Sequence, residues 1–422
     1  MNKINDLNLK EEVFPLFDYA LNSFTRKKIL ELLEHPLISK DAIENRQQIF
    51  AGYLHNHEVL KDYTYAEINL NEVYLFLKEP VMDESSLLSR VSFFEIRRKL
   101  EASFSSKILQ FILLFDKLQT HYLSKIELDV FPSGYQSFIS SLNEFLLQFE
   151  FHKYRKFTKA GEIRTKAASR LIHILQTRKA DGSLDRFWDD LFLFETYLSI
   201  SLGIKASNLV FPEIVAKGIK LQEFYYPSIE NPVKNSLTTQ TNVLLINGPN
   251  MSGKSTLLRS VSLCIYLGHL GFGIPASYGA FPVFSNLSIS INKRDNPKKG
   301  YSHFLNEIQN LKEVVMYSRN KSTPGYAVFD EMFNGTNVED ALEICKATIT
   351  GLSRFESSFF IISTHIQQLR NFMNPKVSAY YMDCTFENQV PTFTYSLKEG
   401  WSDLRLGQYI FKNEGLEQLL DL

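Results

Sequence analysis

The chain has 422 residues, a formal net charge of −1, 44% hydrophobic residues and 13% aromatic residues. These values allow two or three domains with hydrophobic cores, and they exclude an intrinsically disordered chain. The neutral total charge does not decide whether the chain binds nucleic acid, because a local basic strip is enough for such binding.

Three features predict a cytoplasmic protein without membrane contact. The first residues, MNKINDLNLKEEVF, are charged and carry no apolar signal segment. No run of about 18 apolar residues is present, and the richest stretch, residues 191–204, is interrupted by Glu195. The cysteines, Cys264, Cys345 and Cys384, form no CxxC pair, which is typical of buried thiols in a reducing compartment.

Residues 1–205 have few glycines and the periodicity of a helical domain. The apolar spacing predicts a helix that ends near Pro36, a second through residues 96–115 and a third over residues 187–202. Residues 131–134 and 179–183 have the composition of turns. We therefore predict an all-α fold for this half of the chain.

Residues 206–422 alternate short apolar runs with helical stretches. The runs cover residues 243–246, 326–329, 359–362 and 379–382. Runs this apolar are typical of strands buried on both faces, as in a parallel α/β sheet. Residues 391–397 alternate in polarity and predict an edge strand. The second half is thus predicted to be an α/β domain, with the boundary between Leu202 and Glu213.

The segment Gly248-Pro-Asn-Met-Ser-Gly-Lys-Ser255 matches the pattern G-x-x-x-x-G-K-[ST] in full and joins an apolar run to a predicted helix. Glycines let such a loop curl, so that its N–H groups and the helix N-terminus surround phosphate oxygens. Lys254 is then placed to bind the β- and γ-phosphates of ATP, and Ser255 to ligate Mg²⁺. The alternative is a chance match in a glycine-rich loop. The predicted nucleotide-binding residues are Gly248, Pro249, Asn250, Met251, Ser252, Gly253, Lys254, Ser255 and Thr256.

Two further strands end in polar residues. Asp330 and Glu331 follow the apolar run 326–329, which predicts that Asp330 holds the Mg²⁺ and that Glu331 orients or deprotonates the attacking water. His365 follows the run 359–362 and is placed to bond the γ-phosphate. The alternatives are a solvated surface pair and an ordinary loop histidine.

These motifs together resemble the MutS family. Five segments are similar to those of the family. They are the loop sequence GPNMSGKST, the stretch from Asp330 to Asn337, the Ser363-Thr-His365 motif and the segments 300–307 and 393–400. The resemblance implies an ABC-type P-loop ATPase domain over residues 206–422 that uses ATP and Mg²⁺. It also implies a homodimer in which Ser302 contacts the nucleotide of the opposite subunit; the alternative is that Ser302 only caps its own helix.

The first half resembles the family in residues 21–47, 189–201 and 225–230. The resemblance implies a helical core and lever domain over residues 1–205, with a shortened clamp region and without the mismatch-reading domain that precedes it in the family. The chain also departs from the family motifs at His303, Phe333 and Asn334. No aromatic residue near Asn235 matches the family's base-stacking residue.

A basic cluster lies between residues 153 and 170, with Glu162 as its one acidic member; it is either a surface that contacts DNA phosphates or a solvated helix and turn. Its members are Lys153, Arg155, Lys156, Lys159, Arg164, Lys166 and Arg170.

Two functions stay open. The chain is expected to be a dimeric, ATP-hydrolysing DNA-binding protein of the MutS type in repair or recombination. The alternative is an ATP-gated protein scaffold with weak hydrolysis and no mismatch recognition. A transporter ATPase is disfavoured, because no LSGGQ-like run is present.

Overall fold

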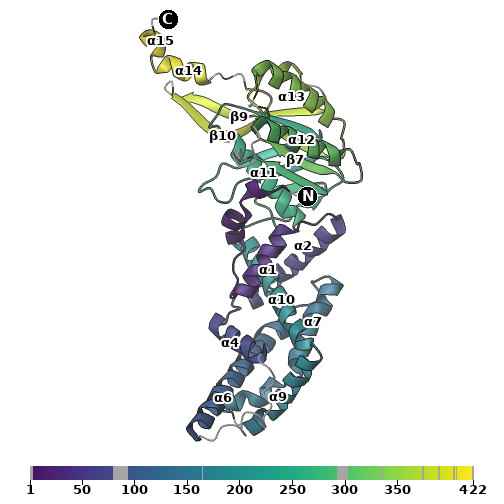
Figure 1. Cartoon of the computed structure of the whole chain (residues 1–422), viewed down its shortest axis with the longest axis vertical. Helices are drawn as coiled ribbons and strands as arrows, with labels where there is room; N and C mark the ends of the chain where they lie inside the picture. Colours follow the sequence, from purple (N-terminus) through teal and green to yellow (C-terminus); the bar gives the residue numbers. More distant parts are fainter. Residues whose placement is uncertain are drawn as a thin grey trace. The chain divides into compact units, whose positions relative to one another are not determined.

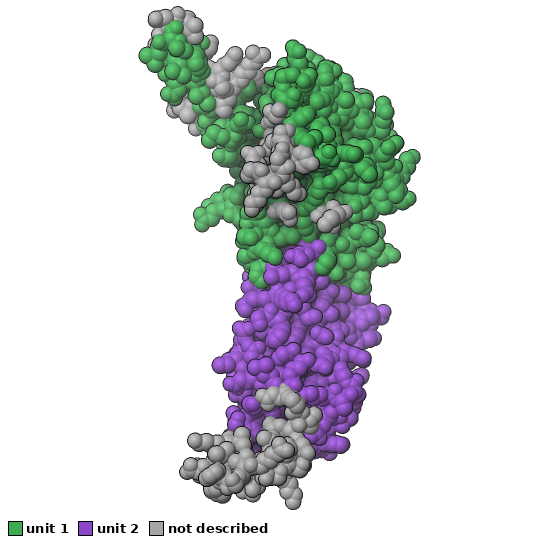
Figure 2. All heavy atoms as spheres, in the orientation of Figure 1, with its two compact units in different colours: residues 1–16, 35–47, 206–422 green, residues 17–34, 48–205 purple. Residues whose placement is uncertain are grey.

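The computed structural model describes residues 3–78, 94–163, 165–291, 303–333, 336–372, 375–387, 390–402, 404 and 406–420. The chain forms two compact units, coloured separately in Figure 2. Unit 1 comprises residues 1–16, 35–47 and 206–422, and unit 2 comprises residues 17–34 and 48–205. Compactness alone does not define domains, so the division into domains 1–205 and 206–422 stays a prediction.

The regular secondary structure of the described residues of unit 2 is all helical, as the sequence predicted for most of the first half. The predicted helices lie within α1, α6 and α10, and the predicted turn at residues 179–183 separates α9 from α10. The helix α2, Lys40–His55, crosses the boundary between the two units. The helices of unit 2 are α1 Ser23–Glu34, α3 His57–Leu60, α4 Glu67–Lys78, α6 Phe94–Lys117, α7 Ser133–Leu147, α8 Arg155–Ala160, α9 Thr165–Ala180 and α10 Ser183–Ala206, with the short helices η4 Leu118–Tyr122, η5 Leu123–Lys125 and η6 Phe151–Tyr154.

Aromatic side chains fill the core of unit 2. The Trp188 ring of α10 is 2% exposed and lies 5.0 Å from the Tyr74 ring, 5.6 Å from Phe115 and 5.7 Å from Phe192, measured between centroids. Aromatic pairs at this spacing stabilise a core beyond the burial of their area. They fasten α4, α6 and α10 to one another.

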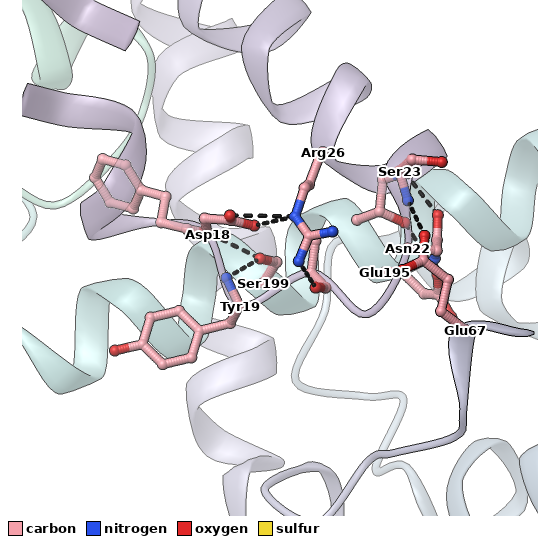
Figure 3. Close-up of polar contacts among 11 residues, drawn as sticks. Asp18, Tyr19, Asn22, Ser23, Arg26, Glu67, Glu195 and Ser199 are labelled. Carbon is pink, nitrogen blue, oxygen red and sulfur yellow. Dashed lines mark hydrogen bonds and ion pairs between the residues drawn. The ribbon is translucent and has the colours of Figure 1, made fainter. Parts of the chain in front are cut away.

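A buried carboxylate also connects the elements of unit 2. Glu195 of α10 is 4% exposed and accepts four hydrogen bonds, from Asn22 Nδ2 at 2.7 Å, Thr25 Oγ1 at 3.0 Å, Tyr63 Oη at 2.6 Å and Tyr65 Oη at 2.8 Å. Figure 3 shows Asn22 and Glu195 of this network. Burial raises the pKa of Glu195, and the four hydrogen bonds oppose that rise. This residue is the polar break that the sequence showed in an otherwise apolar helix.

A six-stranded sheet forms the centre of unit 1 (Figure 1). Its strand order is β10-β9-β4-β8-β7-β6, and all neighbours are parallel except β9 and β10. The predicted apolar runs lie in β4, β7, β8 and β9, and the predicted edge strand lies in β10, so these predictions are confirmed. The strands are β4 Val243–Asn247, β6 Asn286–Ser290, β7 Gly325–Phe329, β8 Phe359–Ser363, β9 Val377–Glu387 and β10 Val390–Glu399.

A second sheet of unit 1, which the sequence did not predict, has the order β1-β5-β2-β3. Its strands are β1 Glu213–Ile214, β2 Ile219–Phe224, β3 Asn235–Thr239 and β5 Tyr278–Phe281. The strand β1 has two residues, and β2 and β3 mix buried with exposed residues, so they carry a weaker signal than the wholly buried strands.

Helices pack against the central sheet of unit 1. Val314 of α12 and Cys345 and Ile349 of α13 belong to the same buried core as Leu245 of β4 and Phe329 of β7. Cys264 is buried like Cys345, as predicted, whereas Cys384 is half-buried. The helices of unit 1 are α11 Lys254–His269, α12 His303–Ser318, α13 Val338–Leu352, α14 Leu406–Asn413 and α15 Leu416–Leu419, with the short helices η1 Asn5–Leu7, η2 Leu9–Val13, η3 Phe14–Leu16 and η8 Gln367–Phe372.

A fully buried histidine closes the end of α11. His269 Nδ1 lies 2.7 Å from the carbonyl oxygen of Ile265, and Nε2 accepts the N–H of Phe284 at 2.8 Å. The neutral ring with its proton on Nδ1 satisfies both bonds. Burial lowers the pKa of His269 to about 4.

Within the part of the chain that the structure describes, no helix is both long and apolar enough to cross a membrane.

Candidate nucleotide site

The glycine-rich loop of residues 248–253 connects the buried strand β4 to α11, as the motif requires. Gly248 and Gly253 have positive φ angles of 146° and 93°, which favour glycine. A Cβ atom at Gly253 would lie 3.1 Å from the Tyr395 ring, and one at Gly248 would lie 3.1 Å from Ser252 Oγ. The loop therefore needs glycine at both positions for its conformation and its packing.

Lys254 is the first residue of α11, and its side chain is 5% exposed. Its ammonium group donates to the carbonyl oxygens of Gly248 at 2.9 Å and Pro249 at 3.0 Å, and lies 3.9 Å from Glu331 Oε1. Burial lowers the pKa of Lys254, and the carboxylates of Glu331 and Asp330 oppose this shift. The lysine is thus folded against its own loop, beside the two carboxylates.

The other loop residues divide between the surface and the interior. Met251 is 82% exposed with a φ of 69°, and Asn250 and Thr256 are exposed as well. Ser252 is fully buried, and its Oγ has no hydrogen-bond partner among the described residues. A buried hydroxyl without a partner is costly, so Ser252 suits a loop that receives a polar ligand.

The predicted metal ligands are in contact. The Ser255 hydroxyl donates to Asp330 Oδ2 at 2.5 Å, although the two residues are 75 positions apart. The contact arises because β4, β8 and β7 are parallel neighbours, so their carboxyl ends meet at one edge of the sheet. Hydroxyl and carboxylate oxygens are the ligands that Mg²⁺ prefers, together with phosphate oxygens, so this pair fits a Mg²⁺–nucleotide complex.

The backbone after β7 is bent into an uncommon conformation. Glu331 has a φ of 51° and Phe333 a φ of 64°, both in the left-handed region. The N–H of Glu331 donates to Ser363 Oγ at 2.8 Å, and the N–H of Phe333 donates to Glu307 Oε2 at 2.8 Å. The Ser363 hydroxyl in turn donates to Asp330 Oδ1. Ser363 and Glu307 lie within the motifs that resemble the family, but no role was predicted for either of them.

His365 lies two residues beyond β8 and is exposed. The N–H of the preceding Thr364 donates to the Ile246 carbonyl at 2.9 Å, and the Thr364 Oγ1 accepts the N–H of Ile366 at 3.1 Å. These bonds tie the segment before and after His365 to the end of β4. Ser302 and Asn334 lie outside the described residues.

An aromatic side chain that the sequence analysis did not identify lies beside the loop. Tyr395 of β10 has a φ of 55°, is 47% exposed, and stands where the pairing of β9 with β10 is irregular. Asn235 holds this turn, because its Nδ2 donates to the Tyr395 carbonyl at 3.0 Å and its Oδ1 accepts the N–H of Leu397 at 2.7 Å. The Tyr395 ring lies beside Gly253 of the loop, although the two residues are far apart in the sequence.

The basic cluster of unit 2 has more acidic neighbours than the sequence suggested. Glu150 pairs with Lys153 at 2.6 Å and with Arg170 at 2.6 Å, and Asp116 accepts two bonds from Arg155 at 2.9 and 3.0 Å. Lys156 and Lys159 are exposed, and Lys156 lies 5.0 Å from the centre of the Phe157 ring. Arg164 and the side chain of Lys166 lie outside the described residues.

Comparison with known proteins agrees with this geometry. The family model of MutS domain V matches residues 244–418. The chain is 27% identical to MutS protein homolog 4 of Homo sapiens over 230 residues, which are 51% of this chain and 24% of the relative. It is 29% identical to MutS protein homolog 4 of Saccharomyces cerevisiae over 205 residues, 46% of this chain and 23% of that relative.

A bacterial relative gives a similar result. The chain is 27% identical to the DNA mismatch repair protein MutS of Lactococcus lactis subsp. cremoris over 201 residues, 47% of this chain and 23% of the relative. The matched region thus spans about a quarter of the length of these relatives. The family match includes the glycine-rich loop, the Asp330–Glu331 pair and the strands that bring them together. Residues 244–418 thus match MutS domain V, and the relatives found are MutS proteins, in agreement with the motifs of this half of the chain.

Proposed function

We propose that this chain binds and hydrolyses Mg²⁺–ATP and uses that cycle to control binding to DNA, in repair or recombination. The observation that carries the proposal is the contact of Ser255 with Asp330 at the mouth of the glycine-rich loop, with Glu331 beside Lys254. The proposal assigns the ATPase to a domain over residues 206–422 and a core and lever role to residues 1–205.

Each residue of the site has a distinct task in this proposal. The N–H groups of residues 250–256 and the N-terminus of α11 bind the phosphates, and Lys254 exchanges its loop carbonyls for phosphate oxygens. Ser255 and Asp330 hold the Mg²⁺, which would neutralise charge on the phosphates.

Glu331 and His365 act at the γ-phosphate. Glu331 orients a water and accepts its proton, while the water oxygen bonds to the γ-phosphorus and the bond to the ADP oxygen breaks. His365 donates a hydrogen bond to the γ-phosphate from the end of β8. The nearby Lys254 ammonium keeps the Glu331 carboxylate in place before ATP enters.

Tyr395 is proposed to stack on the adenine base. Its ring is half exposed, rests on Gly253 at the end of the phosphate loop, and is held by the two hydrogen bonds of Asn235. An aromatic face of this kind provides affinity without reading the edge of the base.

The active form is proposed to be a dimer in which Ser302 reaches the nucleotide of the opposite subunit. The support is the family motif and the position of residue 302 just before α12, whose N-terminus favours an anion. Mixing a Ser302→Ala subunit with a Lys254→Ala subunit tests this arrangement. One composite site then carries both defects and the other carries neither, so activity returns. A mixture that forms dimers and stays inactive would show that Ser302 does not act across the dimer.

DNA is the proposed macromolecular partner, bound largely through its backbone. The support is the family, since a relative is named a DNA mismatch repair protein, and the exposed cations of the basic cluster, such as Lys156 and Lys159. These findings do not favour the scaffold alternative. ATP hydrolysis is measured with and without duplex, mismatched and branched DNA. If any of these DNAs changes the hydrolysis rate, the proposal is supported. If none of them changes it, the DNA-coupled function is contradicted.

A further inference from the structure

One buried hydroxyl contacts both members of the Asp330–Glu331 pair. Ser363 ends β8, which lies between β4 and β7 in the sheet, and its side chain is fully buried. Its Oγ donates to Asp330 Oδ1 and accepts the N–H of Glu331 at 2.8 Å. The hydroxyl therefore uses its proton on one residue and a lone pair on the next.

The contact fixes the orientation of Asp330. Its Oδ1 is bonded to Ser363 and its Oδ2 to Ser255 at 2.5 Å, so each oxygen has its own hydroxyl partner. Rotation of the carboxylate would disturb both bonds. The oxygen that faces Ser255, and hence the proposed metal position, is selected by Ser363 on the opposite side.

The contact also fixes the backbone of Glu331. A left-handed conformation is unfavourable for a residue with a side chain, and Glu331 has a φ of 51°. The bond from its N–H to Ser363 holds this conformation on one side, and the bond from Phe333 to Glu307 holds the turn two residues later. In this conformation Glu331 Oε1 lies 3.9 Å from Lys254 Nζ.

We propose that Ser363 is a positioning residue for ATP hydrolysis, because its hydroxyl sets the direction of the metal-binding carboxylate and of the Glu331 backbone together. The proposal rests on the ATPase function proposed above. The competing explanation is that Ser363 only satisfies a buried N–H group.

The same pair of strands offers a matched control for that explanation. Ser358 precedes β8, is 2% exposed, and its Oγ accepts the N–H of Gly325, the first residue of β7, at 2.9 Å. Ser358 therefore joins the same two strands at the ends opposite Asp330 and Glu331. Ser363→Ala and Ser358→Ala each remove one buried hydroxyl that accepts a backbone N–H.

The experiment measures kcat, the Mg²⁺ concentration that gives half-maximal hydrolysis, and ADP affinity with Mg²⁺ and with EDTA. Ser363→Ala should lower kcat about tenfold, the scale of one lost hydrogen bond to a charged group. It should also raise the half-saturating Mg²⁺ concentration several-fold and weaken ADP binding with Mg²⁺ but not with EDTA. Ser358→Ala should leave all four quantities at the parental values.

The outcomes separate the inference from the function on which it rests. A parent that hydrolyses ATP while Ser363→Ala matches Ser358→Ala in kcat and Mg²⁺ dependence overturns the role of Ser363 alone. A parent that neither binds ADP nor hydrolyses ATP overturns the proposed function itself. If Ser363→Ala does not fold, Ser363→Cys keeps the size of the side chain but forms weaker hydrogen bonds, and parental values in that variant also overturn the inference.

Discussion

The two units place their buried polar groups in different ways. In unit 1 the polar side chains of the candidate site gather where parallel, wholly buried strands end, and the Ser255–Asp330 contact lies beside the proposed phosphate loop. In unit 2 the Glu195 carboxylate lies in the core and takes four hydrogen bonds from neutral side chains.

This difference separates polar groups that are proposed to bind a ligand from polar groups whose partners lie within the fold. The Ser252 hydroxyl is buried without a hydrogen-bond partner among the described residues. The Lys254 ammonium donates to the carbonyl oxygens of Gly248 and Pro249 in its own loop. Glu195, by contrast, already has its donors within unit 2. We therefore expect changes in the first group to affect nucleotide chemistry and changes in the second to affect the free energy of unfolding.

Lys254→Ala should have the largest effect and abolish ATP binding. Lys254 is the one cationic side chain of residues 248–256, so the phosphates lose their charged partner in the loop. Calorimetric titration with ATP checks this. The variant should stay folded, because the hydrogen bonds of the lysine go to carbonyls of its own loop. A parental ATP affinity would reject the loop as the phosphate site.

Acidification should destabilise unit 1 through His269. Its pKa falls from 6.5 to about 4 on folding, so below pH 6.5 the unfolded chain binds a proton that the folded chain does not. The stability from the neutral ring is complete above pH 6.5 and is lost between pH 6.5 and 4, by roughly 3 kcal/mol in total. Urea unfolding at several pH values measures it.

The matched variant for this test is His269→Gln. Glutamine does not titrate, so the difference in unfolding free energy between parent and variant isolates the histidine from the carboxylates of the protein. The variant should lose stability less steeply than the parent from pH 6.5 to 4. Equal slopes for the two proteins would contradict the buried neutral histidine.

Glu195→Gln should cost about 2 kcal/mol of unfolding free energy, the scale for hydrogen bonds to a charged group. The amide replaces one acceptor oxygen with a donor that faces hydroxyl groups already donating to the carboxylate. Chemical unfolding measures the loss, and ADP affinity should stay at the parental value. Glu67→Gln is the control, because Glu67 accepts one exposed bond from the Ser23 N–H. Equal losses in both variants would contradict a central role of Glu195.

DNA affinity should show the smallest single-residue effects. Log K should fall linearly with log salt, with a slope of about −0.9 for each phosphate contact. Lys156→Ala and Lys159→Ala should each flatten that slope by about one contact, since both side chains are exposed. Fluorescence anisotropy with labelled duplex DNA at several salt concentrations measures the slope. A slope that neither variant changes would place the DNA contacts elsewhere.

Local sequence patterns predicted the elements whose signals are contiguous. The phosphate loop, the pair after β7 and the wholly apolar strands could be identified, because each is a continuous run with a strong composition. The strands β1, β2, β3 and β5 could not, since they do not carry such a run. The roles of Ser302, Lys254 and the other site residues remain proposals.

The contacts that complete the site depend on distant parts of the chain. Ser363 reaches Asp330 because of the parallel register of β8 with β7, and that register is set by the whole sheet. Tyr395 reaches Gly253 because β10 is irregular between Phe393 and Leu397. Glu195 could be recognised as a polar break in an apolar helix, but its four donors lie 130 to 173 positions away.

Hydrolysis by Glu331→Gln is the most direct test of the proposed ATPase site. The variant keeps Lys254, Ser255 and Asp330, so it should bind Mg²⁺–ATP with parental affinity. Its single-turnover hydrolysis should be slower by roughly 10²-fold or more, because the water loses its base. The measurement is the conversion of bound ATP to ADP by excess enzyme, with ATP affinity determined on the same preparation. Parental affinity with this loss of rate would support the account, whereas hydrolysis at the parental rate would contradict it.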